Sequence, residues 1–280
     1  METMSQTSLA IEEIREGRRF GFGRNWRRYL DLLDEDRIRT AERSLHDLLG
    51  SGSLAGKTFL DVGSGSGLFS LAARRSGALV HSFDFDPASV ACANKLKARY
   101  FPSDEAWTIQ EGSILDQPIV QALPQSDIVY SWGVLHHTGS MWQALRNVVA
   151  LVKPGGLLCI ALYNDQGWLS KVWTGVKRVY CSGLVGRLLM IAIFFPYFVL
   201  AGLVSDLSKG QHPLKRYREY RKQRGMSVVR DWFDWLGGYP FEVAKPQEVV
   251  GFYEQLGFHL KTLRECRSNG CNEFVFERQR

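Results

Sequence analysis

Cysteine is scarce in this sequence, and none of it is arranged for metal binding or for a disulfide framework. The 280 residues include five cysteines, with no CxxC pair and no cluster of cysteine with histidine. Because zinc sites need closely spaced Cys and His ligands, the sequence predicts no metal centre. The same usage is typical of the reduced cytoplasmic compartment. The cysteines are Cys92, Cys159, Cys181, Cys266 and Cys271.

The chain also lacks a large charge excess and a secretory leader. Lys and Arg number 35 against 29 Asp and Glu, which gives a formal net charge of +6 at pH 7. This mild balance disfavours a dedicated nucleic-acid-binding protein. The segment 1–19 has no apolar run of signal-peptide length and carries acids early, so secretion is not expected.

From residue 58 onward, short apolar runs alternate with amphipathic segments. Such alternation is typical of βαβ units around a parallel sheet with both faces covered by helices. Two later runs, 257–265 and 272–278, flank an Asn-Gly step and predict an antiparallel hairpin. We therefore expect an α/β, Rossmann-like fold with a mostly parallel sheet. Strands are expected at 58–62, 79–84, 106–110, 126–131 and 156–163, and helices near 67–76, 87–99, 117–122 and 140–151.

A glycine loop follows the first expected strand. Glycines stand at alternate positions, Gly63, Gly65 and Gly67, directly after the acidic residue Asp61. A dinucleotide fingerprint, G-x-G-x-x-G, would need its third glycine at the position of Leu68. An acid at the loop entrance repels a pyrophosphate but attracts an ammonium or sulfonium group. The loop therefore favours a cofactor that carries an amino acid over a nicotinamide dinucleotide.

A second acid stands at the end of the second expected strand. The segment 82–87 reads Ser-Phe-Asp-Phe-Asp-Pro. An acid at this place can accept hydrogen bonds from both ribose hydroxyls of an adenosine ligand, and Asp84 is our candidate. The alternative is that Asp84 only caps a turn. Asp86 and Pro87 are expected to begin the following helix.

The order and spacing of these motifs resemble class I S-adenosylmethionine-dependent methyltransferases. The resemblance covers about residues 58–163 and the terminal hairpin, and it is nearest to the ubiquinone-pathway O-methyltransferases. It implies a seven-stranded sheet with S-adenosylmethionine bound at its carboxyl edge. The segments that carry it are Asp61 to Gly67, Asp84, Glu111 to Asp116, Asp127 to His137 and Val152 to Gly156.

The resemblance also implies which residues hold each part of the cofactor. The first loop would hold the methionine part, the acid after the second strand the ribose, and Ser113 with Ile114 the adenine. Many relatives carry Asp where Ser113 stands, so Asp116 either replaces that acidic contact or caps the next helix. The predicted cofactor-binding residues are Asp61, Gly63, Ser64, Gly65, Gly67, Asp84, Phe85, Ser113, Ile114, Ser131 and Trp132.

Methyl transfer from a sulfonium to a hydroxyl needs positioning and a base. His136 and His137 follow the fourth expected strand, and adjacent side chains diverge, so one of them should face the pocket. The register of related enzymes favours His137 as the base. The alternative is that both histidines are structural or contact substrate without taking a proton. At the end of strand five, Tyr163 and Asn164 are expected to line the acceptor site, with Asp165 as a second candidate base.

The chain before and after the sheet divides into segments of different character. Residues 1–56 are polar and helix-prone, and the aromatic stretch 20–26, which contains Trp26, is followed by Tyr29. These aromatics either fold over the cofactor and acceptor as a lid or serve only in packing. The expected segments are 1–56 as a helical lid, 57–163 as the cofactor-binding core, 164–250 as a helical, apolar and basic insert, and 251–280 as the terminal hairpin.

The insert contains an uncharged apolar run at 188–204 that Pro196 interrupts. Topology disfavours a single membrane span, because the terminal hairpin must rejoin a sheet begun before the insert. Basic residues flank the run on both sides, with no acid between Asp165 and Asp206. The run therefore either dips into an anionic membrane face or forms a buried helix pair or an oligomer interface. The aromatic stretch 231–241 either walls the acceptor pocket or packs the insert onto the sheet.

The predicted function is methylation of a small or lipid-linked acceptor, most readily at oxygen, by a cytoplasmic enzyme that sits at the inner membrane face if the insert meets lipid. Nitrogen and carbon acceptors, and RNA, remain alternatives. DNA-base N-methylation is disfavoured, because Ser131-Trp-Gly-Val replaces an Asn/Asp-Pro-Pro-aromatic loop. A nicotinamide-dependent oxidoreductase is disfavoured by Leu68. A non-catalytic docking module is disfavoured by the acids at 61 and 84.

Overall fold

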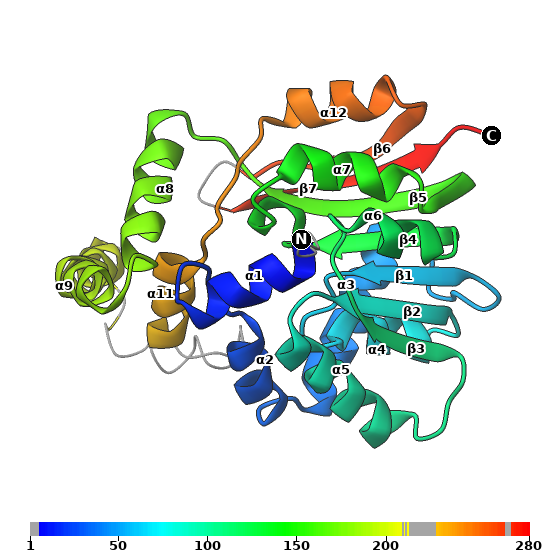
Figure 1. Ribbon diagram of the computed structural model, residues 1–280, viewed down its shortest axis with the longest axis horizontal. Coiled ribbons are helices and arrows are strands. Elements are labelled where there is room, and N and C mark those ends of the chain that lie inside the picture. The colour runs from blue at the N-terminus through cyan, green and yellow to red at the C-terminus, as the bar shows by residue number, and fades with distance from the viewer. Residues whose placement is uncertain (1–5, 209, 211, 213–227, 267–269) are drawn as a thin grey trace, which may run out of the picture.

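The described residues of the computed structural model form one seven-stranded sheet with the order β3-β2-β1-β4-β5-β7-β6 (Figure 1). The described residues are 6–208, 210, 212, 228–266 and 270–280. The first five strands pair in parallel, and β7 pairs antiparallel with both β5 and β6. The strands are β1 (Thr58–Val62), β2 (Leu79–Asp84), β3 (Trp107–Glu111), β4 (Ser126–Trp132), β5 (Val152–Tyr163), β6 (Phe258–Arg264) and β7 (Cys271–Arg278).

This arrangement confirms the predicted fold class, and it corrects one boundary. Strand β5 begins at Val152, ahead of the expected start at residue 156. The register between β4 and β5 shifts after the Ser126–Val152 pair, so the Lys-Pro-Gly-Gly stretch is accommodated as an irregularity inside the strand. The Asn-Gly turn expected between β6 and β7 falls on 267–270, of which residues 267–269 lie outside the described residues.

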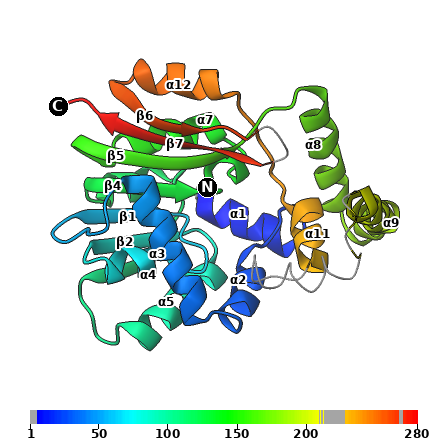
Figure 2. The same ribbon diagram turned by 180° about the vertical axis from the view of Figure 1, so that it is seen from behind.

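Helices cover both faces of the sheet, each over its own apolar core. On one face, α6, α7 and α12 pack against side chains such as Leu60 and Val129. On the other face, α3, α4 and α5 pack against side chains such as Phe59 and Ile128 (Figure 2). Phe59 and Leu60 are successive residues of β1 and point to opposite faces, so the strand is buried on both sides. The helices are α3 (Glu35–Leu49), α4 (Leu68–Arg75), α5 (Pro87–Tyr100), α6 (Gln117–Ala122), α7 (Met141–Val149) and α12 (Pro246–Glu254).

A third group of helices lies beyond the carboxyl ends of the parallel strands (Figure 1). It consists of α8 (Trp168–Tyr180), α9 (Leu184–Ser208) and α11 (Val228–Gly237), which share an aromatic cluster around Trp173. Pro196 does not interrupt α9, contrary to expectation, since the helix continues through it to Ser208. Among the described helices, α9 alone is long and apolar enough to cross a membrane by length and composition.

Two more helices, α1 (Gln6–Arg15) and α2 (Gly23–Leu30), lie between the carboxyl edge of the sheet and that third group (Figure 1). Helix α2 packs against α5, so the N-terminal segment lies across the loops that follow β1 and β2. The space that α1 and α2 cover is the candidate site.

Candidate functional site

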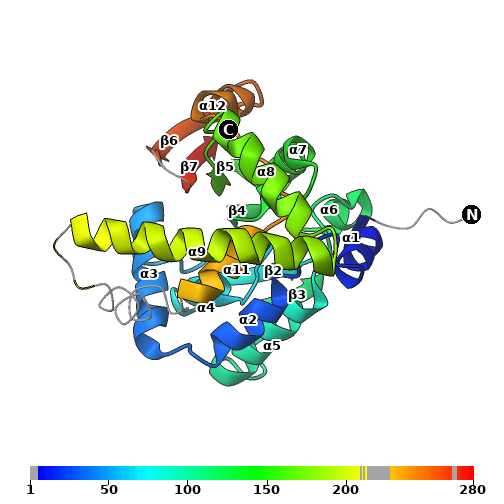
Figure 3. The ribbon, with the colours of Figure 1, turned by 90° about the vertical axis from the view of Figure 1, so that its left-hand side faces the viewer.

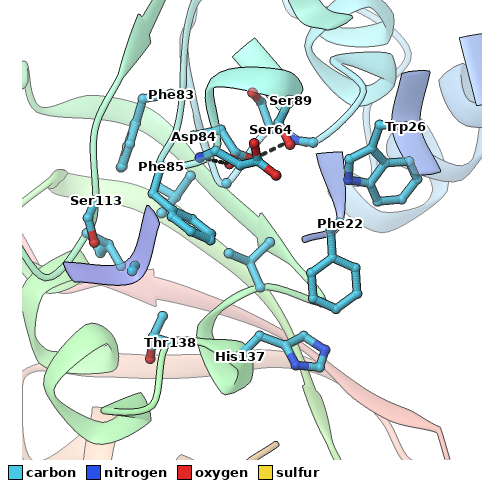
Figure 4. A pocket seen from close by; sticks show the side chains of 18 of the residues that line it. Phe22, Trp26, Ser64, Phe83, Asp84, Phe85, Ser89, Ser113, His137 and Thr138 are labelled. Atoms are coloured by element: carbon cyan, nitrogen blue, oxygen red, sulfur yellow. Dashed lines mark hydrogen bonds between the residues drawn. The ribbon is translucent and has the colours of Figure 1, made fainter. Parts of the chain in front are cut away.

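A cavity of about 830 Å³ opens at the carboxyl edge of the sheet, under α1 and α2. Ligand-binding pockets commonly measure about 300–1,000 Å³, so this one can hold a cofactor together with part of a second molecule. Figure 4 shows Asp84 and Ser64 on one side of it and His137 with Phe22 on the other. The predicted site residues that line it are Trp26, Tyr29, Asp61, Gly63, Ser64, Gly65, Asp84, Phe85, Ser113, Ile114, Trp132, His137 and Tyr163.

Five predicted site residues do not line the cavity. Gly67 is the left-handed N-cap residue of α4, and it turns the chain out of the loop. The hydroxyl of Ser131 is fully buried and donates to Val62 O. The other three, His136, Asn164 and Asp165, lie behind or beyond the cavity wall and are treated below.

The side chains of Asn164 and Asp165 are directed to other partners. The amide of Asn164 donates to Cys266 O and accepts from the Asn272 amide at 3.1 Å, so it joins β5 to the terminal hairpin. The Asp165 carboxylate accepts from the Gly167 N–H at the start of α8. The expectation that both residues line the acceptor site is therefore corrected, while Tyr163, just before them, does line it.

The glycine loop leaves no room for side chains. Gly63 has φ +77°, and a Cβ there would lie 2.3 Å from Val134 Cγ1. A Cβ at Gly65, with φ +54°, would lie 3.0 Å from Trp26 Nε1, so the indole lies directly over the loop. The glycines therefore serve two purposes here, a left-handed turn and close approach of neighbouring groups to bare backbone.

Two carboxylates are buried at the loop. Asp61 accepts a hydrogen bond from Ser70 Oγ at 2.5 Å. Asp84 accepts from the Gly65 N–H and from the Asp86 N–H, each at 2.9 Å. Burial, with the nearby charge of Asp84, raises the pKa of Asp61 to about 7, and burial raises the pKa of Asp84 to about 6. Among the described residues no cation pairs with either carboxylate, so together they favour a positively charged or hydroxyl-rich ligand.

Ser64 carries a hydroxyl without a partner. Its Oγ is buried and has no hydrogen-bond partner among the residues that the structure describes. Ser64 lines the cavity between Asp61 and Gly65. Buried polar atoms nearly always make hydrogen bonds. An unpaired hydroxyl on a cavity wall is therefore available to hydrogen-bond a polar ligand.

His137 lines the opposite wall, and its ring is held in one tautomer. Nδ1 lies 2.6 Å from Pro240 O, and since a carbonyl only accepts, Nδ1 carries the proton and Nε2 the lone pair. Burial is the main cause that lowers the pKa of His137, to about 3, with the charges of Lys177 and Arg19 acting the same way. The imidazole is therefore neutral at physiological pH.

His136 lies behind His137 and away from the cavity. It is fully buried, its Nδ1 accepts from the Tyr163 N–H, and the two histidine rings are 4.5 Å apart. Burial lowers its pKa well below the usual value. Of the two adjacent histidines, only His137 lines the cavity.

Carboxylates at the sheet edge hold both α1 and α2. The N–H and hydroxyl of Thr7, in α1, donate to the Asp116 carboxylate. The N–H of Gly23, the first residue of α2, donates to Asp86, whose other oxygen accepts from the Ala88 N–H at the start of α5. Asp116 therefore holds α1 and makes no side-chain cap on α6, contrary to the capping expectation.

The N-terminal segment also contacts the loop that carries His137. Arg19 donates to the carbonyls of His137 and Thr138 and to the Glu13 carboxylate. The Phe22 ring lies 4.9 Å from the imidazole of His137. The aromatic stretch is visible in the sequence, but the role of Arg19 is not, because a contact across more than a hundred residues leaves no local signal.

Asp116→Ala is expected to loosen α1 without unfolding the sheet. The change removes the acceptor of two buried hydrogen bonds, so the local cost is about 1–3 kcal/mol. Backbone amides of 6–15 should exchange with solvent roughly ten- to a hundredfold faster, as measured by hydrogen-exchange mass spectrometry. Asp165→Ala, which removes a carboxylate with no contact to α1, is the matched control. Unchanged exchange in the Asp116 variant would show that α1 is held by packing alone.

Comparisons with known proteins agree with this geometry. Residues 60–158 match the family model described as a methyltransferase domain. Ubiquinone biosynthesis O-methyltransferase of Citrobacter koseri is 32% identical over 126 residues, which are 44% of this chain and 50% of that protein. The enzyme of the same name from Salmonella typhimurium has the same identity and coverage. The chain thus spans about half the length of these curated relatives.

Solved structures with little sequence identity share the fold. Magnesium protoporphyrin IX methyltransferase of Synechocystis, with bound S-adenosylmethionine, has a TM-score of 0.56 at 14% identity, with both chains fully covered. An O-methyltransferase family protein of Burkholderia thailandensis has a TM-score of 0.53 at 13% identity, covering 86% of this chain and 57% of that one. These findings agree with the resemblance to S-adenosylmethionine-dependent methyltransferases: residues 60–158 match a methyltransferase domain, and the fold is shared with solved methyltransferases.

Proposed function

We propose that this chain, whose residues 60–158 match a methyltransferase domain, transfers a methyl group from S-adenosylmethionine to an oxygen atom of a small or lipid-linked acceptor. The observation that carries the proposal is one cavity with two different walls. Asp61 and Asp84 are buried at one wall, and the neutral imidazole of His137 lies at the other (Figure 4). The first wall suits a cationic adenosyl amino acid, and the second suits an acceptor hydroxyl.

The residues present fit the cofactor. Asp61 and the unpaired hydroxyl of Ser64 would hold the amino-acid part, where the ammonium group offsets the buried charge. Asp84 would hold the ribose hydroxyls, with Ser113 and Ile114 beside the adenine. When bound, S-adenosylmethionine supplies an electrophilic methyl group on a sulfonium.

His137 would take the acceptor proton. Its Nδ1–H is committed to Pro240 O, so Nε2 is the free lone pair. An imidazole with a lowered pKa is a weak base, but it is neutral and therefore ready at all physiological pH values. A weak base is sufficient because a hydroxyl becomes much more acidic as its oxygen forms the new bond to carbon.

The lid would exclude water and position the acceptor. Phe22, Trp26 and Tyr29 of the N-terminal segment line the cavity together with Tyr163. An aromatic, water-poor enclosure of this kind suits an acceptor with an apolar ring or chain. This lining supports a small aromatic or lipid-linked acceptor over a nucleic acid.

The purified chain is expected to bind S-adenosylmethionine and its demethylated product in a calorimetric titration, with no heat from a nicotinamide dinucleotide. Incubated with methyl-labelled cofactor and fractionated host extract, it should place label in the lipid or small-metabolite fraction. Label in RNA would contradict the proposed acceptor class. Absence of cofactor binding would contradict the proposed function as a whole.

A further inference from the structure

Helix α9 has one packed side and one open side. Its packed side is fixed by aromatic contacts: the Phe194 ring lies 5.4 Å from Trp173 of α8, and the Phe195 ring 4.9 Å from Phe233 of α11. Its open side carries large apolar residues at helical spacing, of which Val185 is 81% and Val204 66% exposed. Other exposed members are Leu188, Leu189, Ile193 and Leu200. A continuous apolar stripe of this length is uncommon on a protein surface that meets only water.

Helix α8 extends this open side with basic and aromatic residues. Trp168 is 75% exposed, and Lys171 and Arg178 are exposed at the helical spacing that places them on the same side of α8. Arg187, in the first turn of α9, is exposed as well. Figure 3 shows α8 and α9 together on the side of the molecule that faces the viewer. We name the exposed sides of these two helices the α8–α9 face.

The charge of the α8–α9 face has one sign. Residues 166–205 contain no Asp or Glu, and the basic residues on the exposed side of α8 are Lys171 and Arg178. An apolar stripe beside tryptophan and basic side chains matches the headgroup region of an anionic bilayer, which accepts apolar groups and attracts cations. Two copies of this face against each other would instead bring like charges together, with no acid of the segment to pair them.

We propose that the α8–α9 face docks on an anionic lipid bilayer, with α9 lying along the interface. The packed side of α9 is held by α8 and α11, so the helix lies on the membrane and does not cross it. The further step, that the acceptor is presented from the bilayer, rests on the proposed function. The docking itself does not.

A series of aromatic ring contacts connects the α8–α9 face to the cavity. Trp173 of α8 lies 5.3 Å from the Trp235 ring, and Trp235 lies 6.0 Å from the ring of Tyr163, which lines the cavity. The helices that carry the face lie beyond the carboxyl ends of the strands (Figure 1). Docking through this face would therefore place the cavity end of the molecule nearest the lipid, where an acceptor with an apolar tail is concentrated.

The test is co-sedimentation of the full chain, without cofactor, with two kinds of vesicle. One is phosphatidylcholine alone, and the other is phosphatidylcholine with an equal amount of phosphatidylglycerol. The chain should sediment with the anionic vesicles, and binding should weaken as salt is raised. Leu189→Glu with Leu200→Glu should lower the vesicle affinity by at least about tenfold. Lys171→Gln and Arg178→Gln should each lower it by about fivefold.

Leu79→Glu is the matched control, since Leu79 is as exposed as Leu189 but lies at the start of β2, away from the face. Its vesicle affinity should equal that of the parent chain. Failure of the parent chain to bind anionic vesicles would overturn the docking proposal, as would a dimer that Leu189→Glu with Leu200→Glu dissociates. Cofactor calorimetry on the same preparations separates the two proposals: vesicle binding without cofactor binding contradicts only the function, and the reverse contradicts only the docking.

Discussion

His137→Ala is expected to lower kcat by about 10²–10⁴-fold, the range that a positioned general base contributes. The side chain lines the cavity wall opposite the glycine loop, so its removal takes away the proposed proton acceptor together with the hydrogen bond from Nδ1–H to Pro240 O. Affinity for S-adenosylmethionine should change little, because Asp61 and Asp84 lie on the other wall. Single-turnover kinetics with saturating cofactor and calorimetry on the same variant would measure the two effects separately.

The pH dependence of kcat in the parent chain gives a second test of the role of His137. Because the pKa of His137 is lowered to about 3, kcat at saturating cofactor should show no step near 6.5, the usual value for histidine. His259→Ala, which changes an exposed histidine on β6, is the control and should keep full activity. Near-normal turnover of His137→Ala would remove the base assignment and leave His137 as a contact residue.

Asp61→Asn is expected to weaken cofactor binding strongly while stabilising the protein without cofactor. Asparagine retains an acceptor for Ser70 Oγ but loses the charge that would pair with the ammonium group. Hydrogen bonds to charged groups contribute about 1.5–3 kcal/mol, so affinity should fall by roughly ten- to a hundredfold. The stabilisation follows because the native carboxylate is buried without a cation among the described residues, and its pKa is raised to about 7.

The stability difference should depend on pH in one direction. In the unfolded chain Asp61 ionises with its ordinary pKa of 3.8, whereas in the folded protein it holds its proton to about pH 7. Protonation therefore stabilises the native fold at low pH, and this contribution is lost as pH rises from about 4 to about 7. The Tm of Asp61→Asn should equal that of the parent near pH 4 and exceed it above pH 7. A lower Tm for the variant at pH 8 would contradict the buried-charge assignment.

Added cofactor should reverse the order of the two proteins. The parent gains stability in proportion to cofactor binding, and Asp61→Asn gains little. Thermal denaturation with and without S-adenosylmethionine at one pH above 7 would show both effects together. Ser89→Ala provides a control at the same cavity, because it removes a buried hydroxyl without removing a charge.

Much of the sheet could be predicted from the sequence because its signals are local. The short apolar runs of β1 and β2, and the Asp86-Pro87 start of α5, each depend on residues adjacent in the chain. The Gly63-to-Gly67 loop could be predicted for the same reason, because residues in the left-handed conformation are usually glycine. The start of β5 was missed because Pro154 and Gly155 normally indicate a loop.

The parts of the site that could not be predicted depend on distant partners. Nothing near Asp116 indicates that its carboxylate binds Thr7, and nothing near Asn164 indicates that its amide binds Cys266 and Asn272. The same holds for Ser131, which follows a strand like a cofactor residue but donates its hydroxyl to Val62 O. A polar residue at a sheet edge has several partners within reach, and the packing decides among them.

The strand order has a consequence for synthesis on the ribosome. Helices α1 and α2 are translated before the carboxylates of Asp116 and Asp86 that hold them. Strand β6 lies at one edge of the sheet and pairs only with β7 among the described strands. It therefore has no partner until β7 has been made. The nascent chain therefore exposes α1 and α2 until their carboxylate partners are made, and later exposes β6 until β7 is made; a chaperone that shields apolar surface would act during those intervals.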